Sequence, residues 1–237
     1  MYKIIITTSG TGSRLKGITQ NKNKALIDVG NIKVIDHIIN SYNSNLELII
    51  TVGYFAKEVT SYIKKKYSDR SIRFIPVEPF EGPGSSLGYS LLQAKNSLQC
   101  PFVFHCNDTI IKGNIPSPEH TNWNGVSNGL NAKIYNTNNY SSVVVENGHI
   151  KKIQMKGAKE YDAFHIGLVG IKDYKEFWEK LENNYKKNPL DATLNDVSAI
   201  SEMIQEGLLF KAIEFKEWYD TGNLDSLNDT NVKLNSF

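Results

Sequence analysis

Apolar runs and helical patterns alternate along the first half of the chain. Four short apolar runs predict strands, at 2–7, 46–52, 71–76 and 101–106. Three intervening segments carry apolar residues at helical spacing, at 33–44, 55–67 and 86–98. This alternation is typical of βαβ units and predicts strands that run mainly parallel.

The second half of the chain has a different pattern. Residues 112–140 are rich in asparagine and show no regular alternation, so we expect loops there. Between 141 and 153, two β-branched runs flank Asn147-Gly148, which is a strong hairpin signal. Further elements are predicted as a strand at 164–171, helices at 173–186 and 195–207, and a strand at 208–215.

Composition narrows the class of protein. Of 237 residues, 40% are hydrophobic and 22% are charged, which is ordinary for a soluble globular chain. The formal net charge of +2 gives no reason to expect a nucleic-acid partner, and no apolar run reaches the roughly 20 residues that span a membrane. Cys100 and Cys106 have no metal-type spacing, and we find no export signal, so we expect reduced thiols and a cytoplasmic protein.

The loop after the first strand is the strongest candidate for chemistry. Small polar residues and two glycines follow the buried run, so backbone N–H groups can approach an oxyanion closely. Arg14 and Lys24 add cations nearby. This combination indicates a grip for a nucleoside triphosphate. The candidate phosphate-binding residues are Thr8, Ser9, Gly10, Thr11, Gly12 and Ser13.

Two common nucleotide motifs do not fit this loop. Leu15 stands where the dinucleotide fingerprint has its third glycine, and the P-loop pattern ending in Gly-Lys-Ser/Thr is absent. Ser13 has no accompanying His/Asp pattern of a hydrolase. The loop therefore fits neither of these motifs, and an ordinary tight turn is the alternative to a phosphate-binding loop.

The loop and the residues after it resemble a known family, the sugar-1-phosphate nucleotidyltransferases. That family has Ala-Gly-x-Gly-Thr-Arg-Leu/Met and then Pro-Lys-Pro/Ala-Leu, where this chain has Ser9–Leu15 and Lys24-Ala25-Leu26. The resemblance continues in order over residues 2–227. The later matching segments are Val52-Gly53-Tyr54, Gly82–Leu87, Asn107-Asp108, His165-Ile166-Gly167 and Trp218–Asn223.

The resemblance implies a fold, a reaction and a set of roles. It implies a Rossmann-like, GT-A-like α/β fold with a mixed, mainly parallel sheet flanked by helices, in which a nucleotidyl group passes from CTP, GTP, UTP or dTTP to a phosphorylated small molecule. Arg14 and Lys24 would be catalytic, and Mg²⁺ would bind Asp108 and Asp220, each of which follows a strand. The additional nucleotide contacts would be Gly82, Gly84 and Ser85, and the acceptor contacts Lys156, His165 and Gly167.

The same reasoning predicts one domain over residues 1–237. Its nucleotide-binding half would cover about 1–111 and its acceptor-binding half about 112–228, with a frayed tail at 229–237. We expect His105 to be a hydrogen-bonded core histidine. The sequence leaves a homo-oligomer open.

Departures from the family pattern leave the substrates open. Thr8-Ser9 replaces two alanines, and Asn23 replaces the proline before the lysine. The family's Glu-Lys-Pro is here Met155-Lys156-Gly157, which keeps only the lysine. The leading hypothesis is transfer to a sugar 1-phosphate, giving an NDP-sugar for surface glycans. The alternatives are a cytidylyltransferase for a non-sugar phosphate, such as a phosphocholine-like or amide phosphate, and a non-catalytic protein that binds nucleotide sugars. A glycosyltransferase is disfavoured because its Asp-x-Asp motif is missing.

Overall fold

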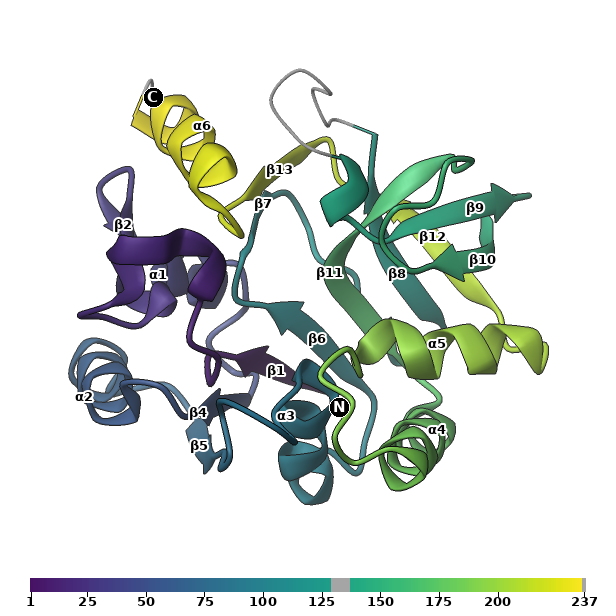
Figure 1. Ribbon diagram of the computed structural model, residues 1–237, viewed down its shortest axis with the longest axis horizontal. Helices are drawn as coiled ribbons and strands as arrows, with labels where there is room; N and C mark the ends of the chain where they lie inside the picture. Colours follow the sequence, from purple (N-terminus) through teal and green to yellow (C-terminus); the bar gives the residue numbers. More distant parts are fainter. Residues whose placement is uncertain (129–136, 236–237) are drawn as a thin grey trace.

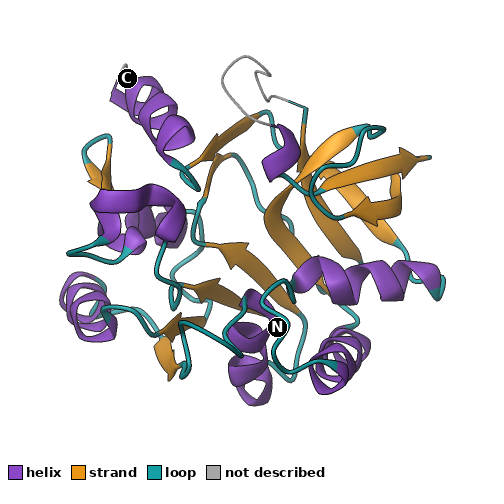
Figure 2. Ribbon diagram, viewed as in Figure 1, coloured by secondary structure: helices purple, strands orange, loops and turns teal. Residues whose placement is uncertain are grey.

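The computed structural model describes residues 1–128 and 137–235. Its elements form a mixed α/β fold around one nine-stranded sheet (Figure 1 and Figure 2). Four strands of the first half are parallel neighbours: β1 (Lys3–Thr7), β4 (Leu48–Val52), β5 (Ile72–Pro76) and β6 (Phe102–Cys106). The helices between them are α1 (Val34–Asn40), α2 (Ala56–Lys66) and α3 (Leu87–Ala94). The predicted strands and helices of this half are confirmed.

The strands of this half are apolar on both faces because helices cover both faces. Ile4 and Ile6 of β1 pack into one core cluster with α1 and α2, whereas Ile5 packs into a second cluster with α3. Two further helices, α4 (Tyr174–Lys187) and α5 (Asp196–Gln205), complete the second cluster. This explains why the buried strands lack polar alternation.

The second half curls into a small barrel. Its strands are β8 (Asn122–Ser127), β9 (Ser142–Glu146), β10 (His149–Gln154), β11 (Ala163–Ile171) and β12 (Phe210–Glu214). The sheet order is β5-β4-β1-β6-β11-β8-β12-β10-β9, and β9 also pairs with β11, which closes the barrel. The predicted hairpin at 141–153 is confirmed as β9 and β10.

The prediction of a mainly parallel sheet is wrong. β11 runs antiparallel to β6, β8 and β9, and β10 runs antiparallel to both of its neighbours. Among the described strands of this half, only β12 and β8 are parallel to each other. Two strands that a short hairpin joins must run antiparallel, as β9 and β10 do. The second half therefore does not continue the parallel pattern of the first half.

Strand β8 was not predicted, because residues 112–140 were expected to be loops. Its sequence is polar, yet every residue of the strand is buried. The side-chain amide of Asn122 is fully hydrogen-bonded to the segment after β11. Its Oδ1 accepts from the N–H groups of Lys172 and Asp173, and its Nδ2 donates to the Asp173 carboxylate. Side-chain hydrogen bonds thus make a polar strand compatible with burial.

Two short ribbons and the last helix complete the fold. β7 (Thr109–Lys112) pairs antiparallel with β13 (Glu217–Asp220), and β2 (Asp28–Val29) pairs with β3 (Ile32–Lys33). Short 3₁₀ turns are η1 (Ser13–Thr19), η2 (Lys24–Leu26), η3 (Lys95–Ser97) and η4 (Thr137–Asn139). No helix of the described residues is long and apolar enough to cross a membrane.

The expected frayed tail is instead largely helical. Helix α6 (Leu224–Asn235) packs against β13, β2 and η1. The hydroxyl of buried Thr230 donates to the carbonyl of Asp220, and Asn231 accepts from Gly30 N. The polar composition of this segment did not predict a helix. The helix is stabilised by its contacts with the other segments. Residues 236 and 237 lie outside the described residues.

Candidate functional site

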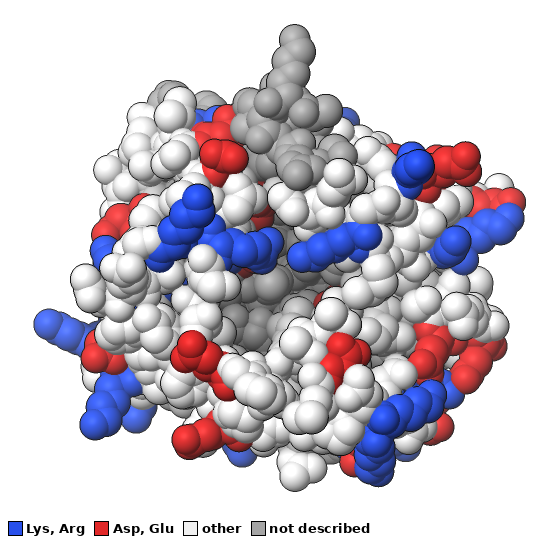
Figure 3. Space-filling model, in the orientation of Figure 1, with Lys and Arg blue, Asp and Glu red and all other residues white. Residues whose placement is uncertain are grey.

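Two cavities meet at the carboxyl ends of the central strands. The smaller, of about 320 Å³, is lined by the loop after β1, and the larger, of about 580 Å³, lies between β6, β11, β13 and the start of α5. Both are lined by Arg14, Leu87, Cys106 and Asp108. Figure 3 shows a hollow in this face, with Lys and Arg side chains along its upper rim and Asp and Glu side chains along its lower rim.

The loop after β1 is a turn that exposes backbone to the smaller cavity. Gly12 has φ 67°, and the N–H of Leu15 closes the turn on the Gly12 carbonyl at 2.9 Å. A Cβ on Gly12 would lie 3.1 Å from Thr19 Cγ2, so glycine fits both the backbone and the space. Gly10 does not adopt a positive φ, and a Cβ at this position would have no heavy atom within 4 Å.

Asn23 holds this loop in place. Its side chain is fully buried, and Nδ2 donates to the carbonyls of Thr8 at 2.8 Å and Tyr54 at 2.6 Å. Its Oδ1 accepts from the N–H of Ala25 at 2.8 Å. One amide therefore ties three segments together and fixes Lys24, the next residue along the chain.

Opposite charges converge where the two cavities meet. Lys24 Nζ lies 2.9 Å from Asp108 Oδ2, and an Arg14 guanidinium nitrogen lies 3.4 Å from the same oxygen. Burial alone would raise the pKa of Asp108, but the two cations hold it well below its usual range. The side chain of Asp108 is therefore ionised. Both cations contact it at the place where the two cavities adjoin.

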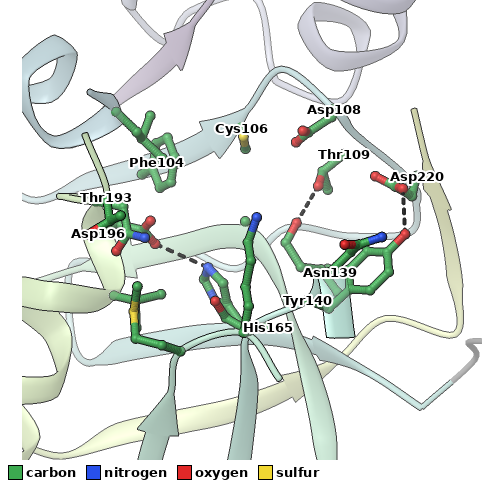
Figure 4. A pocket seen from close by; sticks show the side chains of 18 of the residues that line it. Phe104, Cys106, Asp108, Thr109, Asn139, Tyr140, His165, Thr193, Asp196 and Asp220 are labelled. Atoms are coloured by element: carbon green, nitrogen blue, oxygen red, sulfur yellow. Dashed lines mark hydrogen bonds and ion pairs between the residues drawn. The ribbon is translucent and has the colours of Figure 1, made fainter. Parts of the chain in front are cut away.

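Asp220 reaches the same place from the other end of the chain. Pairing of β7 with β13 sets Asp220 opposite Thr109, next to Asp108. Burial, with the charge of Asp108 beside it, raises the pKa of Asp220. Tyr140 donates to its Oδ2 at 2.7 Å and Gly222 N donates to its Oδ1 at 3.0 Å; Figure 4 shows the tyrosine contact.

Asp108 and Asp220 fit the coordination of Mg²⁺, which needs few protein ligands, better than that of a metal bound entirely by protein side chains. A Cβ placed on Gly222 would lie 3.0 Å from Asp220 Oδ1 and 3.3 Å from Asp108 Oδ2, so both oxygens border one small space that glycine leaves open. Among the described residues, no group of three or more His, Cys, Asp or Glu side chains could hold a metal. Mg²⁺ commonly takes one or two carboxylates and completes its shell with phosphates and water.

The acceptor candidates line the larger cavity. Lys156 is exposed, yet partial desolvation and the nearby charge of Arg14 lower its pKa. Gly167 has φ 71°, and its bulge carries β11 so close to β6 that a Cβ would lie 2.8 Å from Cys106 Cβ. His165 also lines this cavity.

Most of the predicted site residues come together. The smaller cavity is lined by Thr8, Ser9, Gly10, Thr11, Gly12, Arg14, Lys24 and Ser85. The larger cavity is lined by Arg14, Asp108, Lys156, His165, Gly167 and Asp220. Ser13, Gly82 and Gly84 line neither cavity; the two glycines adopt positive φ and shape the loop before α3. Which of these residues contact substrates stays a prediction.

Sequence reasoning missed two polar residues of the larger cavity. These residues are Tyr140 and Asp196. The sequence did contain one relevant signal: Asn195 is a good N-cap residue, and it places Asp196 in the first turn of α5. Only the tertiary structure shows that this turn faces β11. His105 is the expected core histidine: it contacts Tyr42 OH at 2.7 Å and the Thr109 carbonyl at 2.8 Å.

The fold and site define a mixed α/β protein with two adjoining cavities, at whose junction Arg14 and Asp108 lie. No protein-family model matches the chain. It is 29% identical over 238 residues to the bifunctional protein GlmU of Methanococcus maripaludis, covering 98% of this chain and 54% of the relative. It is 30% identical over 115 residues to choline-phosphate cytidylyltransferase of Streptococcus pneumoniae, covering 46% of each chain. The chain spans about half the length of the curated relatives that it matches.

Solved structures share the fold over nearly the whole chain. A putative glucose-1-phosphate thymidylyltransferase from Bacillus anthracis superposes with a TM-score of 0.80 and 17% identity, covering 100% of this chain and 96% of that one. The inositol-1-phosphate CTP transferase from T. maritima gives 0.77 and 16%, covering 100% and 95%. The CTP:phosphocholine cytidylyltransferase from Streptococcus pneumoniae gives 0.75 and 18%, covering 98% and 99%. The chain is thus similar in sequence and in fold to nucleotidyltransferases, the class of protein that its motifs resemble.

Proposed function

We propose that this chain transfers a nucleotidyl group from a nucleoside triphosphate to the phosphate of a small molecule and releases pyrophosphate. The observation that carries the proposal is the convergence of Lys24, Arg14 and Asp108 between two adjoining cavities. One cavity offers backbone and small polar groups, as a triphosphate requires. The other offers Lys156 and space for the rest of an acceptor.

The chemistry needs charge stabilisation and alignment. A phosphate monoester is largely a dianion at pH 7, so it can attack without a general base. One acceptor phosphate oxygen forms a bond to the α-phosphorus in line, the bond from that phosphorus to the bridging oxygen breaks, and pyrophosphate leaves with the electron pair. Because the reaction needs no general base, the proposal assigns no such role to a histidine.

Each cation has a separate role in this proposal. Arg14 and the loop amides hold the leaving phosphates, Lys24 stabilises charge on the α-phosphate, and Lys156 holds the acceptor phosphate. Asp108 and Asp220 would hold Mg²⁺, which when bound supplies positive charge to the phosphates. The acceptor that we favour is a sugar 1-phosphate, on the motif resemblance, and the product would be an NDP-sugar. The second candidate is cytidylyl transfer to a non-sugar phosphate, which the choline-phosphate cytidylyltransferase relative supports.

Pyrophosphate release tests the function directly. Each of CTP, GTP, UTP and dTTP is incubated with Mg²⁺ and a panel of sugar 1-phosphates, inositol 1-phosphate and phosphocholine. We expect release with one nucleotide and one acceptor class, and loss of release in Asp108→Asn. Asp69→Asn, an exposed carboxylate in the turn after α2, serves as the matched control. Nucleotide binding without release across the panel would favour the non-catalytic alternative, and the lack of any nucleotide binding would contradict the assignment of the loop.

A further inference from the structure

Main-chain contacts bring Asp220 beside Asp108. Strand pairing sets Asp220 opposite Thr109, and the N–H of Thr221 donates to the carbonyl of Asp108 at 2.9 Å. From α6, the Thr230 hydroxyl donates to the carbonyl of Asp220 at 2.7 Å. These contacts fix the backbone of Asp220, but they leave the rotation of its carboxylate to contacts of the side chain itself.

The two carboxylate oxygens of Asp220 have different surroundings. Oδ1 accepts from the N–H of Gly222 at 3.0 Å and borders the small space that it shares with Oδ2 of Asp108. Oδ2 accepts from the Tyr140 hydroxyl at 2.7 Å. A carboxylate oxygen has two lone pairs, so Oδ1 keeps one for a cation after it has bound the N–H. Oδ1 is therefore the oxygen that can face a metal, and Tyr140 holds the other one.

Packing fixes the ring of Tyr140 on two sides. Tyr140 lies two residues before β9 and lines the larger cavity. Its ring contacts Trp218 of β13 edge-on, with the ring centroids 5.8 Å apart, and Phe164 of β11 at the same distance. Figure 4 shows the hydroxyl pointing to Asp220. Because its ring is held on both sides, the hydroxyl is a preorganised donor for this carboxylate.

Two adjacent carboxylates repel each other when both are ionised. Without a cation, rotation of the Asp220 side chain away from Asp108 would reduce this repulsion. Such a rotation would break the hydrogen bond from Tyr140, so the tyrosine opposes it.

We propose that Tyr140 is a positioning residue of the metal site, which holds Oδ2 of Asp220 so that Oδ1 faces Asp108 and both aspartates can bind one Mg²⁺. The proposal rests on the proposed nucleotidyl transfer, which assigns the ion to these two carboxylates. Hydrogen-bond partners that orient a ligating carboxylate typically contribute about tenfold to a hundredfold in metal affinity. A hydroxyl at the start of the barrel thus sets the affinity of a site whose ligands follow β6 and end β13.

Mn²⁺ binding measures this role without turnover. Mn²⁺ replaces Mg²⁺ as the probe, and electron paramagnetic resonance measures the free ion in titrations without nucleotide. Tyr140→Phe keeps the ring and its packing and loses only the hydroxyl. We expect its Kd for Mn²⁺ to rise about tenfold to a hundredfold. The matched control is Tyr161→Phe, which should bind as the wild type does, because Tyr161 also packs on Phe164, with centroids 4.6 Å apart, but lines neither cavity.

The Mg²⁺ dependence of pyrophosphate release separates positioning from a structural role. In Tyr140→Phe, the Mg²⁺ concentration that gives half of the maximal rate should rise about tenfold to a hundredfold. The kcat at saturating Mg²⁺ should stay within about threefold of the wild type, because excess metal restores occupancy of the site. A variant that is only less well folded would lose rate at every Mg²⁺ concentration.

A double variant tests whether Tyr140 acts through Asp220. If it does, Tyr140→Phe should weaken Mn²⁺ binding in the wild type and should not weaken it further in Asp220→Asn, because the interaction has already been removed.

Three results would overturn the proposal: an unchanged Kd for Mn²⁺ in Tyr140→Phe, a loss of rate in this variant that saturating Mg²⁺ does not restore, or wild-type affinity for Mn²⁺ in Asp220→Asn. If no substrate pair releases pyrophosphate, the proposed function fails, while the Mn²⁺ titrations still decide whether Tyr140 positions a metal site.

Discussion

In the proposed function both cavities hold a phosphate and its carrier, and they do so with different parts of the chain. One side of the smaller cavity is the continuous loop after β1, whose backbone is fixed by a buried amide, Asn23. The larger cavity collects single side chains from β6, β11, β13 and α5. A phosphate presents the same oxyanions whatever its carrier, so main-chain donors suffice for it. Acceptors differ from one substrate to another, so in the proposed function their recognition falls to the side chains that line the larger cavity.

This difference makes the two cavities separable by mutation. Changes in the loop should alter nucleotide binding and leave the acceptor KM unchanged, and changes near α5 should do the reverse. Residues between the cavities should alter the rate for every substrate pair.

Lys24→Ala should have the largest effect, because Lys24 lies between the cavities. We expect a fall of roughly 10²–10³ in kcat for every nucleotide and acceptor, by analogy with the removal of one preorganised donor from an oxyanion site. Steady-state pyrophosphate release measures it. Lys22→Ala, an exposed lysine two residues earlier, is the control and should behave as wild type. A loss below about fivefold would remove Lys24 from the catalytic set.

The packing of His105 predicts a pH dependence of stability. Burial lowers the pKa of His105 to about 4, from 6.5 in an unfolded chain, and its ring nitrogens are satisfied in the neutral form. Between these two values the unfolded chain binds the extra proton, so the free energy of unfolding rises with pH across this window. The contribution is complete above about pH 6.5 and is lost as the pH falls towards 4, by about 3 kcal/mol in all.

Denaturant titrations at pH 4.5, 5.5 and 7 on the wild type and His105→Gln measure this term. The glutamine does not titrate, so the gap in stability between the two proteins should widen as the pH rises. His149→Gln, in the hairpin turn, corrects for the loss of an imidazole outside the core. A gap that stays constant with pH would mean that His105 titrates normally in the folded chain.

The sequence could predict the loop cavity far better than the larger one. A continuous apolar strand, two glycines and Lys24 are local signals, and the structure brings them together as expected. Strand β8 carries polar residues whose burial depends on Asn122 bonding to Asp173, which is 51 residues away. The approach of Asp220 to Asp108 depends on the pairing of β7 with β13. Barrel closure likewise follows from the second pairing of β9, with β11, and no local pattern specifies it.

Asn23→Ala should show the smallest effect and the most selective one. The variant loses three hydrogen bonds and leaves the carbonyls of Thr8 and Tyr54 without this donor, which should cost about 1–3 kcal/mol of stability. Because Asn23 fixes the loop but does not reach the larger cavity, we expect the KM for the nucleotide to rise about tenfold with the acceptor KM unchanged. Initial rates with each substrate varied in turn measure both constants.

The matched control for this variant is Asn21→Ala, an exposed asparagine two positions earlier that removes the same side chain without breaking the buried contacts. Equal rises in the KM of both substrates for Asn23→Ala would mean that its amide supports the whole site. In that case the two cavities would not be independent. A rise confined to the nucleotide would show that the loop recognises its substrate separately from the larger cavity, although the two cavities share Arg14, Leu87, Cys106 and Asp108.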